Sequence, residues 1–288
     1  MTPKQRLWLS RFFIIIFLVT TPLILAYAAG YHVNWRYLKL ERTGLLEIKT
    51  EPAKAKASID ELKAWLIKPK DLTTPLKLKN LRPGNYTVKL DLAGYHSWKK
   101  TLTINPAETT FAKNIRLFKK STPELIFALP AETDLAIADW AKNNDYNLNN
   151  KQASTSSITY FLNDKQLADN WLNTQDVKSI CQLTNKKLAI AKEFELWLAD
   201  PDKKETTLLG RFSKPIKQLI CLPDSDNYLI YGHDSSWELI ELDNRQNHNI
   251  WRLAELQQLN KAAINKKGDR LYFYGRLHDQ NGLFSLEL

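Results

Sequence analysis

Residues 81–92 read LRPGNYTVKLDL, and this stretch decides the fold of the first half of the chain. Proline holds φ at about −65° in the second position of a β-turn and glycine accepts positive φ in the third, so Pro83 and Gly84 predict a type II turn. From residue 88 onward, apolar side chains alternate with lysine and aspartate. Such alternation places one face of a strand in a core and the other in water, so the stretch predicts an antiparallel sheet.

The alternation continues on both sides of this stretch. Upstream, residues 45–50 read as a strand that Pro52 closes, and residues 57–60 read as a second short strand. Downstream, Gly94 allows the chain to reverse before two more strands. The apolar positions of those strands are Tyr95, Trp98, Leu102 and Ile104, and then Phe111, Ile115 and Leu117. Residues 61–74 are longer than a hairpin needs, which predicts a helical turn or a decorated loop.

These motifs resemble the PEGA domain, a small β-sandwich found mostly on extracytoplasmic proteins of bacteria and archaea. The resemblance covers residues 44–118 and rests on PAKA (52–55), TP (74–75), LRPGNYTV (81–88) and GYHSW (94–98). It implies a sandwich without catalysis or an established ligand, and hence a binding or spacing role. The chain departs from the family at Lys54, where a glycine is usual, and at Glu61, where the glycine after the second strand is missing.

The distal half, residues 121–288, repeats one order of strands. In each repeat an apolar strand leads to a second strand that ends in an acidic residue: 188–191 to 195–200, 228–231 to 238–243, and 271–274 to 283–287. The acidic ends, Asp200, Asp243 and Glu287, lie 43 and 44 residues apart. A period of about 40 to 45 residues is typical of β-propeller blades, and the pattern resembles TolB-like and WD-type propellers.

The length of this half suits about four propeller blades. We expect the first blade in residues 123–176, although its strands are poorly marked and residues 143–157 read as a polar loop. Three arrangements stay open: a small closed ring, an open array, or part of a propeller that a partner completes.

An uncharged apolar stretch near the start, residues 12–29, reads FFIIIFLVTTPLILAYAA. As a helix it would be about 27 Å long, close to the thickness of a bilayer core, and it therefore predicts a membrane span. Lys4, Arg6 and Arg11 precede the stretch and favour a cytoplasmic N-terminus. The alternative is a signal peptide cleaved after Ala28. The order of this helix and the PEGA-like module is also similar to membrane-anchored proteins of candidate-phylum bacteria.

The net charge of +10 is concentrated near the membrane. Residues 31–120 carry 19 basic and 8 acidic side chains, whereas residues 121–288 carry 19 basic and 23 acidic side chains. A basic module beside a membrane is attracted to anionic lipid or to wall polymers, although the same lysines could simply form a solvated surface. Nucleic acid would also suit the charge, but an extracytoplasmic location argues against it.

The two cysteines, Cys181 and Cys221, are 40 residues apart, which matches the repeat. They could therefore occupy equivalent strands of neighbouring blades and form a disulfide. Because both lie in apolar runs, we expect buried free thiols instead.

No motif has the spacing that catalysis, a cofactor or a metal requires, so the sequence predicts no catalytic, cofactor-binding or metal-ligating residue. The histidines are scattered: His32, His96, His233, His248 and His278. Residues 233–236 (HDSS) hold the residue types of a hydrolytic triad, but neighbours on one turn cannot form its geometry. The repetition of the acidic ends in the distal half predicts turn or strand-end residues, in preference to a set of ligands.

We expect most tryptophans beyond the membrane span to pack in the core, whereas a few could be exposed and stack on sugars or a peptide. They are Trp65, Trp98, Trp140, Trp171, Trp197, Trp237 and Trp251. Trp35 and Tyr37 follow the apolar stretch closely and predict anchoring at the lipid headgroups.

The sequence as a whole predicts a mainly β, single-pass protein of the plasma membrane with extracytoplasmic C-terminal domains. Its expected parts are a cytoplasmic N-terminus (1–11), a transmembrane helix (12–30), a juxtamembrane linker (31–43), a PEGA-like β-sandwich (44–118) and a β-propeller-like domain (121–288). We expect a noncatalytic binding or scaffold protein that presents its propeller-like domain to cell-wall polymer or an envelope protein. The alternative is an envelope glycan or peptide hydrolase with its site at the propeller axis.

Overall fold

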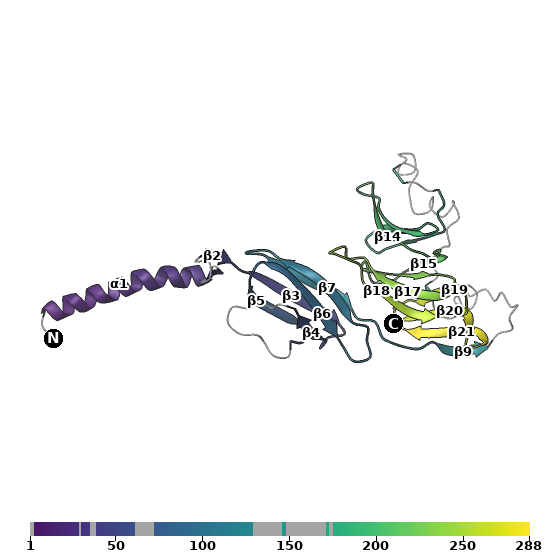
Figure 1. Cartoon of the computed structure of the whole chain (residues 1–288), viewed down its shortest axis with the longest axis horizontal. Coiled ribbons are helices and arrows are strands. Elements are labelled where there is room, and N and C mark those ends of the chain that lie inside the picture. Colours follow the sequence, from purple (N-terminus) through teal and green to yellow (C-terminus); the bar gives the residue numbers. More distant parts are fainter. Residues whose placement is uncertain are drawn as a thin grey trace. The chain divides into compact units, whose positions relative to one another are not determined.

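The computed structural model describes residues 3–28, 30–34, 39–60, 72–128, 146–147, 171–172 and 175–288. It shows a mainly β chain with an N-terminal apolar helix (Figure 1). The chain divides into two compact units: an N-terminal unit of Met1–Leu92 and Ser97–Leu117, and a C-terminal unit of Ala93–His96 and Phe118–Leu288. Most of residues 61–74 and of the expected first blade lie outside the described residues.

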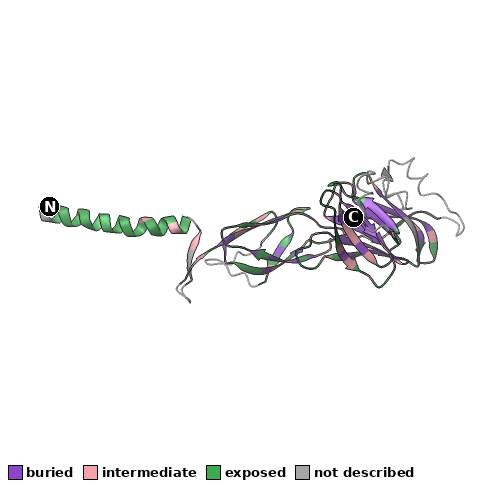
Figure 2. Cartoon of the chain, turned by 90° about the horizontal axis from the view of Figure 1, so that it is seen from above, coloured by how far each residue is buried: buried purple, intermediate pink, exposed green. Residues whose placement is uncertain are grey.

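Helix α1 spans Pro3–Ala28 and therefore begins before the predicted boundary at residue 12. Its apolar side chains are exposed along the whole length (Figure 2). Within the described part of the chain, this is the one helix long and apolar enough to cross a membrane. Because every backbone hydrogen bond of a helix is made internally, such a segment suits a bilayer or the apolar part of a signal sequence.

The predicted linker folds back on itself. Strands β1 (Tyr31–Asn34) and β2 (Lys39–Arg42) form an antiparallel hairpin. The backbone N–H of Thr43 then donates to the carbonyl oxygen of Gly30 at 3.0 Å. Consequently the chain starts its next strand beside the residue that follows helix α1.

The next six strands form the N-terminal sandwich. One sheet has β3 (Gly44–Glu51) between β5 (Leu76–Leu81) and β8 (Thr109–Arg116), antiparallel to β5 and parallel to β8. The other sheet has β6 (Gly84–Asp91) between β4 (Lys56–Ile59) and β7 (Trp98–Ile104). Most of the alternating apolar residues meet between the sheets as predicted, but Phe111 lies on the outer face of β8, because Ala112 takes the inward position beside it. The buried core includes Leu46, Ile48, Val88, Leu90, Trp98, Leu102 and Ile104.

The first turn of the sandwich keeps a glycine-like backbone although lysine occupies it. Lys54 has φ of 68°, a left-handed conformation that glycine adopts most readily. Buried Thr74 holds the turn, because its Oγ1 accepts from the N–H of Ala55 at 3.0 Å and its carbonyl oxygen accepts from the N–H of Lys54 at 2.8 Å. The departure from the family pattern is therefore absorbed by Lys54 itself.

Within its described residues, the C-terminal unit contains three antiparallel sheets in chain order. The first comprises β11 (Ser179–Gln182), β12 (Leu188–Ala191), β13 (Glu195–Asp200) and β14 (Glu205–Arg211). The second comprises β15 (Gln218–Cys221), β16 (Tyr228–Gly232), β17 (Ser236–Glu241) and β18 (Ile250–Glu255). The third comprises β19 (Gln258–Asn265), β20 (Arg270–Leu277) and β21 (Gln280–Glu287), flanked by β10 (Tyr146–Asn147) and β9 (Glu124–Ala128).

The repeated segments of the sequence coincide with the middle strands of these sheets. Strand β9 differs from the expectation, since it pairs with the last strand of the chain instead of opening a first blade of its own. Thus the beginning and the end of the C-terminal unit meet in one sheet.

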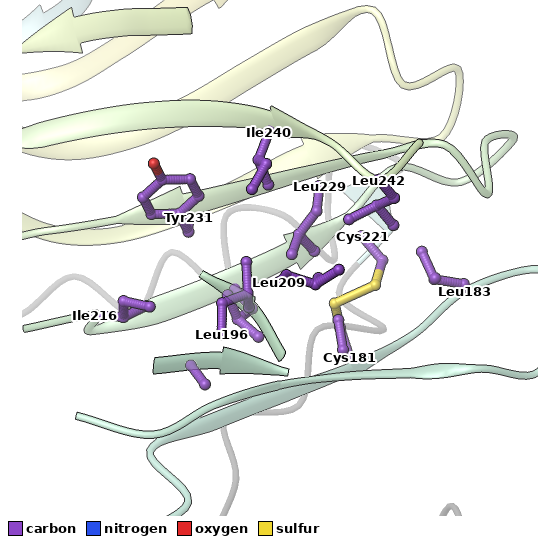
Figure 3. Close-up of a cluster of buried hydrophobic side chains, with 13 residues drawn as sticks. Cys181, Leu183, Leu196, Leu209, Ile216, Cys221, Leu229, Tyr231, Ile240 and Leu242 are labelled. Atoms are coloured by element: carbon purple, nitrogen blue, oxygen red, sulfur yellow. A yellow bond between two sulfur atoms is a disulfide. The ribbon is translucent and has the colours of Figure 1, made fainter. Parts of the chain in front are cut away.

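A disulfide joins the first two of these sheets. Cys181 on β11 and Cys221 on β15 are bonded, with their Cα atoms 5.8 Å apart, so the prediction of free thiols is wrong. Their spacing of 40 residues is close to one repeat, and the two cysteines take equivalent places in two neighbouring first strands, opposite Ala189 and Leu229 of the second strands. Figure 3 shows the bond inside a buried apolar cluster that includes Leu183, Leu229 and Leu242.

Two buried polar side chains make further links between first strands. Ser179 Oγ accepts from the N–H of Leu219 at 2.9 Å, which joins β11 to β15. Gln218 uses both ends of its amide on Ala262, donating to the carbonyl oxygen at 2.9 Å and accepting from the N–H at 3.1 Å, which joins β15 to β19. All three sheets are therefore connected through their first strands.

Candidate functional site

The HDSS stretch is a hairpin turn between β16 and β17, as predicted. The N–H of His233 donates to the carbonyl oxygen of Ser236 at 2.9 Å. The buried His233 ring has its Nδ1 2.9 Å from the carbonyl oxygen of Pro215, while Asp234 forms an ion pair with Lys217 at 3.3 Å. The side chains of His233 and Asp234 are thus engaged with Pro215 and Lys217, and the nucleophile, base and acid of a triad are not assembled here.

The repeated acidic residues lie at or just after strand ends, and each is paired with a basic side chain. Asp200 lies 3.2 Å from Lys187 and also accepts from the N–H groups of the two residues that form the next turn, Asp202 and Lys203. Asp243 binds Arg245, and Glu287 binds Lys119. Among the described residues, histidine, cysteine, aspartate and glutamate form no group that could hold a metal ion.

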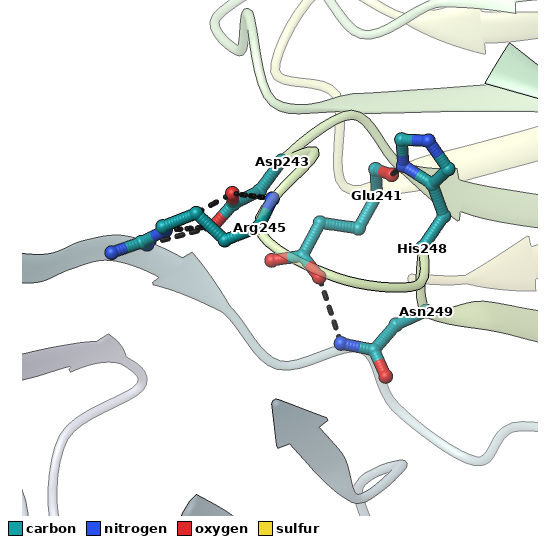
Figure 4. A network of polar contacts seen from close by, with 5 residues as sticks. All are labelled: Glu241, Asp243, Arg245, His248 and Asn249. Atoms are coloured by element: carbon teal, nitrogen blue, oxygen red, sulfur yellow. Dashed lines mark hydrogen bonds and ion pairs between the residues drawn. The ribbon is translucent and has the colours of Figure 1, made fainter. Parts of the chain in front are cut away.

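The loop between β17 and β18 contains a compact polar network (Figure 4). Buried Glu241 accepts from Asn249 Nδ2 at 2.7 Å, and its carbonyl oxygen lies 2.7 Å from His248 Nδ1. Beyond it, Arg245 donates to both carboxylate oxygens of Asp243. These contacts join the end of β17 to the loop that follows it, and we assign them the role of fixing that loop against the sheet.

A buried tyrosine and a glutamate form the other prominent polar pair of the C-terminal unit. Tyr231 Oη donates to Glu238 Oε2 at 2.7 Å across neighbouring strands. Burial, followed by the interaction with Glu238, raises the pKa of Tyr231 far above its ordinary value. The phenol therefore stays protonated and serves as a hydrogen-bond donor, which excludes it as a nucleophile near neutral pH.

The described tryptophans beyond helix α1 are at least half-buried, in agreement with the core prediction. Trp98 and Trp237 are fully buried, and Trp251 packs near Phe118 and Tyr228. Trp197 donates its Nε1 hydrogen to Glu195 at 2.9 Å. The remaining predictions concern Trp35, Tyr37, Trp65 and Trp140, which lie outside the described residues.

One outer face of the N-terminal sandwich gathers four lysines around one glutamate. The register of the β5-β3-β8 sheet places Glu47 opposite Lys77 on one side and opposite Phe111 on the other, so all three share a face. Alternation adds further lysines from all three strands. We call the group made by Lys49, Lys77, Lys79, Lys113, Glu47 and Phe111 the lysine face.

Glu47 sits at the centre of the lysine face. Its carboxylate is 3.4 Å from Lys113 Nζ and 3.6 Å from Lys49 Nζ. Partial desolvation acts to raise the pKa of Glu47, but the attraction of Lys113, together with that of Lys49 and Lys77, outweighs it and lowers the pKa. Glu47 is therefore ionised near neutral pH and offsets only one of the four lysine charges.

Phe111 is the large apolar side chain of this face and is 48% exposed. Lys113 Nζ lies 3.9 Å from the centre of its ring, within the range of a cation–π contact. The sequence indicated a basic module but not this convergence, because the parallel pairing of β3 with β8 joins strands far apart in the chain. The alternation of lysine and leucine in residues 76–79 was the one local signal.

No curated protein matches this chain. Among solved structures, the crystal structure of the N-terminal domain of Nup159 is similar over 39% of this chain and 31% of that chain, with 18% identity and a TM-score of 0.25. The chain thus spans less than a third of that structure's length, and a likeness at this TM-score carries no argument. The family model of the PEGA domain matches residues 43–121, the stretch that holds the N-terminal sandwich, and supports the resemblance drawn from its motifs.

Proposed function

We propose that the chain is a noncatalytic, membrane-anchored binding or scaffold protein whose PEGA domain and propeller-like C-terminal unit lie outside the cytoplasm. In this role the C-terminal unit is presented to cell-envelope polymer or to a protein partner. The PEGA match supports an extracytoplasmic binding or scaffold role for the N-terminal sandwich.

The observation that carries the proposal is that one chain contains both an exposed apolar helix and a buried disulfide. Helix α1 has no protein core to cover its apolar side chains among the described residues, which suits retention in lipid. Disulfides persist in oxidising compartments and are rare in the cytosol, so the Cys181–Cys221 bond favours an extracytoplasmic C-terminal unit. Both features agree with the positive charges that precede the helix.

A propeller-like arrangement of about four blades explains the C-terminal unit best. Its three sheets follow the repeat period and are linked through their first strands. The last sheet is completed by β9 from the start of the unit, which is how a ring of repeated sheets is closed without a long free edge. Propeller-like units of this kind present broad surfaces made from several loops.

The full-length protein in detergent tests this function. It is passed over purified wall polymer and over fractionated membrane proteins from the same cells, and bound material is eluted with salt. A retained complex of fixed stoichiometry with one purified component supports the proposal. Release of sugar or peptide products without a stable complex contradicts it and favours the hydrolase alternative.

The anchor is tested separately by N-terminal sequencing of the mature protein and by protease protection in spheroplasts. An intact N-terminus, with the sandwich accessible from outside, is expected. Cleavage after Ala28 would make the stretch an export signal and remove the anchor.

A further inference from the structure

We propose that the lysine face of the N-terminal sandwich docks on the anionic lipid headgroups of the membrane that holds helix α1. The inference rests on the proposed membrane anchoring and adds a second contact between the chain and the same bilayer.

Charge is the first step of the argument. Four lysines from three neighbouring strands surround one glutamate, and Lys49 is more than half exposed. At the end of the same strands Glu51 and Arg116 are paired in register, so they add no net charge. Strands lie about 4.8 Å apart, so the lysines form a flat cluster about 10 Å wide. A flat basic surface is complementary to a plane of anionic headgroups.

The path of the chain is the second step. Helix α1 ends at Ala28, and the N–H of Gly30, two residues later, is bonded to the carbonyl oxygen of Tyr27 at 3.0 Å. Thr43 is bonded back to Gly30 through its N–H and also through its hydroxyl, at 3.1 Å, and β3 begins at the next residue. The hairpin between them therefore adds no length to the connection. The central strand of the lysine face is thus tethered within a few residues of the membrane, which raises its effective concentration at the headgroups.

Phe111 supplies the third step. A half-exposed phenylalanine among lysines suits the boundary between headgroups and acyl chains, where aromatic and basic side chains together favour binding. A soluble polyanion would bind the lysines equally well. It would not explain why the face lies so close in sequence to helix α1, or why a phenylalanine is exposed within it.

Residue-resolved acetylation of the full-length protein tests the inference. The protein is reconstituted into vesicles of phosphatidylcholine alone or of phosphatidylcholine with phosphatidylglycerol, and a water-soluble reagent acetylates the exposed lysines. We expect acetylation of Lys49, Lys77, Lys79 and Lys113 to slow about fivefold in anionic vesicles, and high salt to remove the protection. Lys89 and Lys99 serve as internal controls, since they are exposed and paired on the other sheet.

Two matched variants sharpen the result. In Lys77→Gln/Lys79→Gln the protection of Lys49 and Lys113 should fall severalfold, because half of the lysine charge is gone. In Lys89→Gln/Lys99→Gln it should not change. Equal protection in neutral and anionic vesicles overturns the inference. So does stronger protection by soluble polyphosphate than by anionic vesicles, which would assign the face to a polymer.

Flotation of the vesicles after a high-salt wash separates the two levels of the argument. Protein that does not float contradicts the anchor, and with it the proposed function. Protein that floats while its lysine face stays unprotected contradicts the docking inference alone.

Discussion

The two units of this chain differ in how most of their strands pair, although the sandwich and the C-terminal unit each pair their first strand with their last. In the N-terminal sandwich the central strand β3 pairs with β5 and, in parallel, with β8, so the first and last strands are direct neighbours. In the C-terminal unit consecutive strands pair in chain order within each of the first two sheets, and separate links join one sheet to the next. The sandwich should therefore unfold as one body, whereas the C-terminal unit should depend on the bonds between its sheets.

The largest expected effect is that of Trp98→Ala in the sandwich. Trp98 is fully buried between the two sheets, and truncation of such a side chain costs about 3 to 5 kcal/mol. Hydrogen exchange on the full-length protein should show faster exchange across all strands of the sandwich. Faster exchange confined to β7 would contradict the prediction that the sandwich unfolds as one cooperative unit. Trp237→Ala, also fully buried, is the control and should act in the second sheet of the C-terminal unit.

The next effect is that of the disulfide. Cys181→Ala/Cys221→Ala opens a link of sequence separation 40, and a loss of about 2 to 4 kcal/mol is expected. Denaturant unfolding monitored by hydrogen exchange should show a lower stability of the first sheet of the C-terminal unit. The stability of the sandwich should not change. Wild-type protein under a membrane-permeant reductant is the control and should behave like the variant. Unaltered stability in both would mean that the sheets hold together without the bond.

Gln218→Leu tests the second link and should cost about 1 to 3 kcal/mol, because it leaves a buried N–H and a buried carbonyl of Ala262 without their partner. The effect should appear as faster exchange in β15 and β19. Gln182→Leu changes an exposed glutamine at the end of β11 and should leave stability within about 0.5 kcal/mol of wild type. Equal effects of the two substitutions would show that Gln218 does not couple the sheets.

Local signals predicted most strands of the sandwich and the middle strands of the C-terminal sheets, but not the place of β9 or the β1–β2 hairpin. Alternating residues marked β6, and the repeat marked the middle strands of the C-terminal sheets, because each strand carries its own pattern of buried and exposed side chains. The pairing between distant strands was not predictable in this way. The repeat placed Cys181 and Cys221 at equivalent positions, but whether equivalent positions lie within bonding distance depends on how neighbouring sheets pack.

The lysine face shows the same limit. Lysines were visible throughout residues 31–120, yet their convergence depends on the parallel register of β3 and β8, which no turn connects. Propensity and alternation describe a strand, whereas a surface made by three strands is a property of their order in the sheet. The pairing of β9 with the last strand was not predicted for the same reason.

The smallest effect concerns the first turn of the sandwich, where sequence and backbone disagree. Lys54 has a positive φ of 68°, a conformation that costs a non-glycine residue about 1 to 2 kcal/mol. Glycine would remove this cost, but it would also lose more conformational entropy on folding, which offsets part of the gain. Lys54→Gly should therefore stabilise the sandwich by about 0.5 to 1 kcal/mol. Lys56→Gly is the matched control, since Lys56 is an exposed residue of strand β4 and should lose about as much. A destabilised Lys54→Gly protein would contradict this prediction. It would show that the lysine side chain stabilises the turn by more than the backbone conformation costs. The residue that departs from the family pattern would then contribute to the stability of the sandwich.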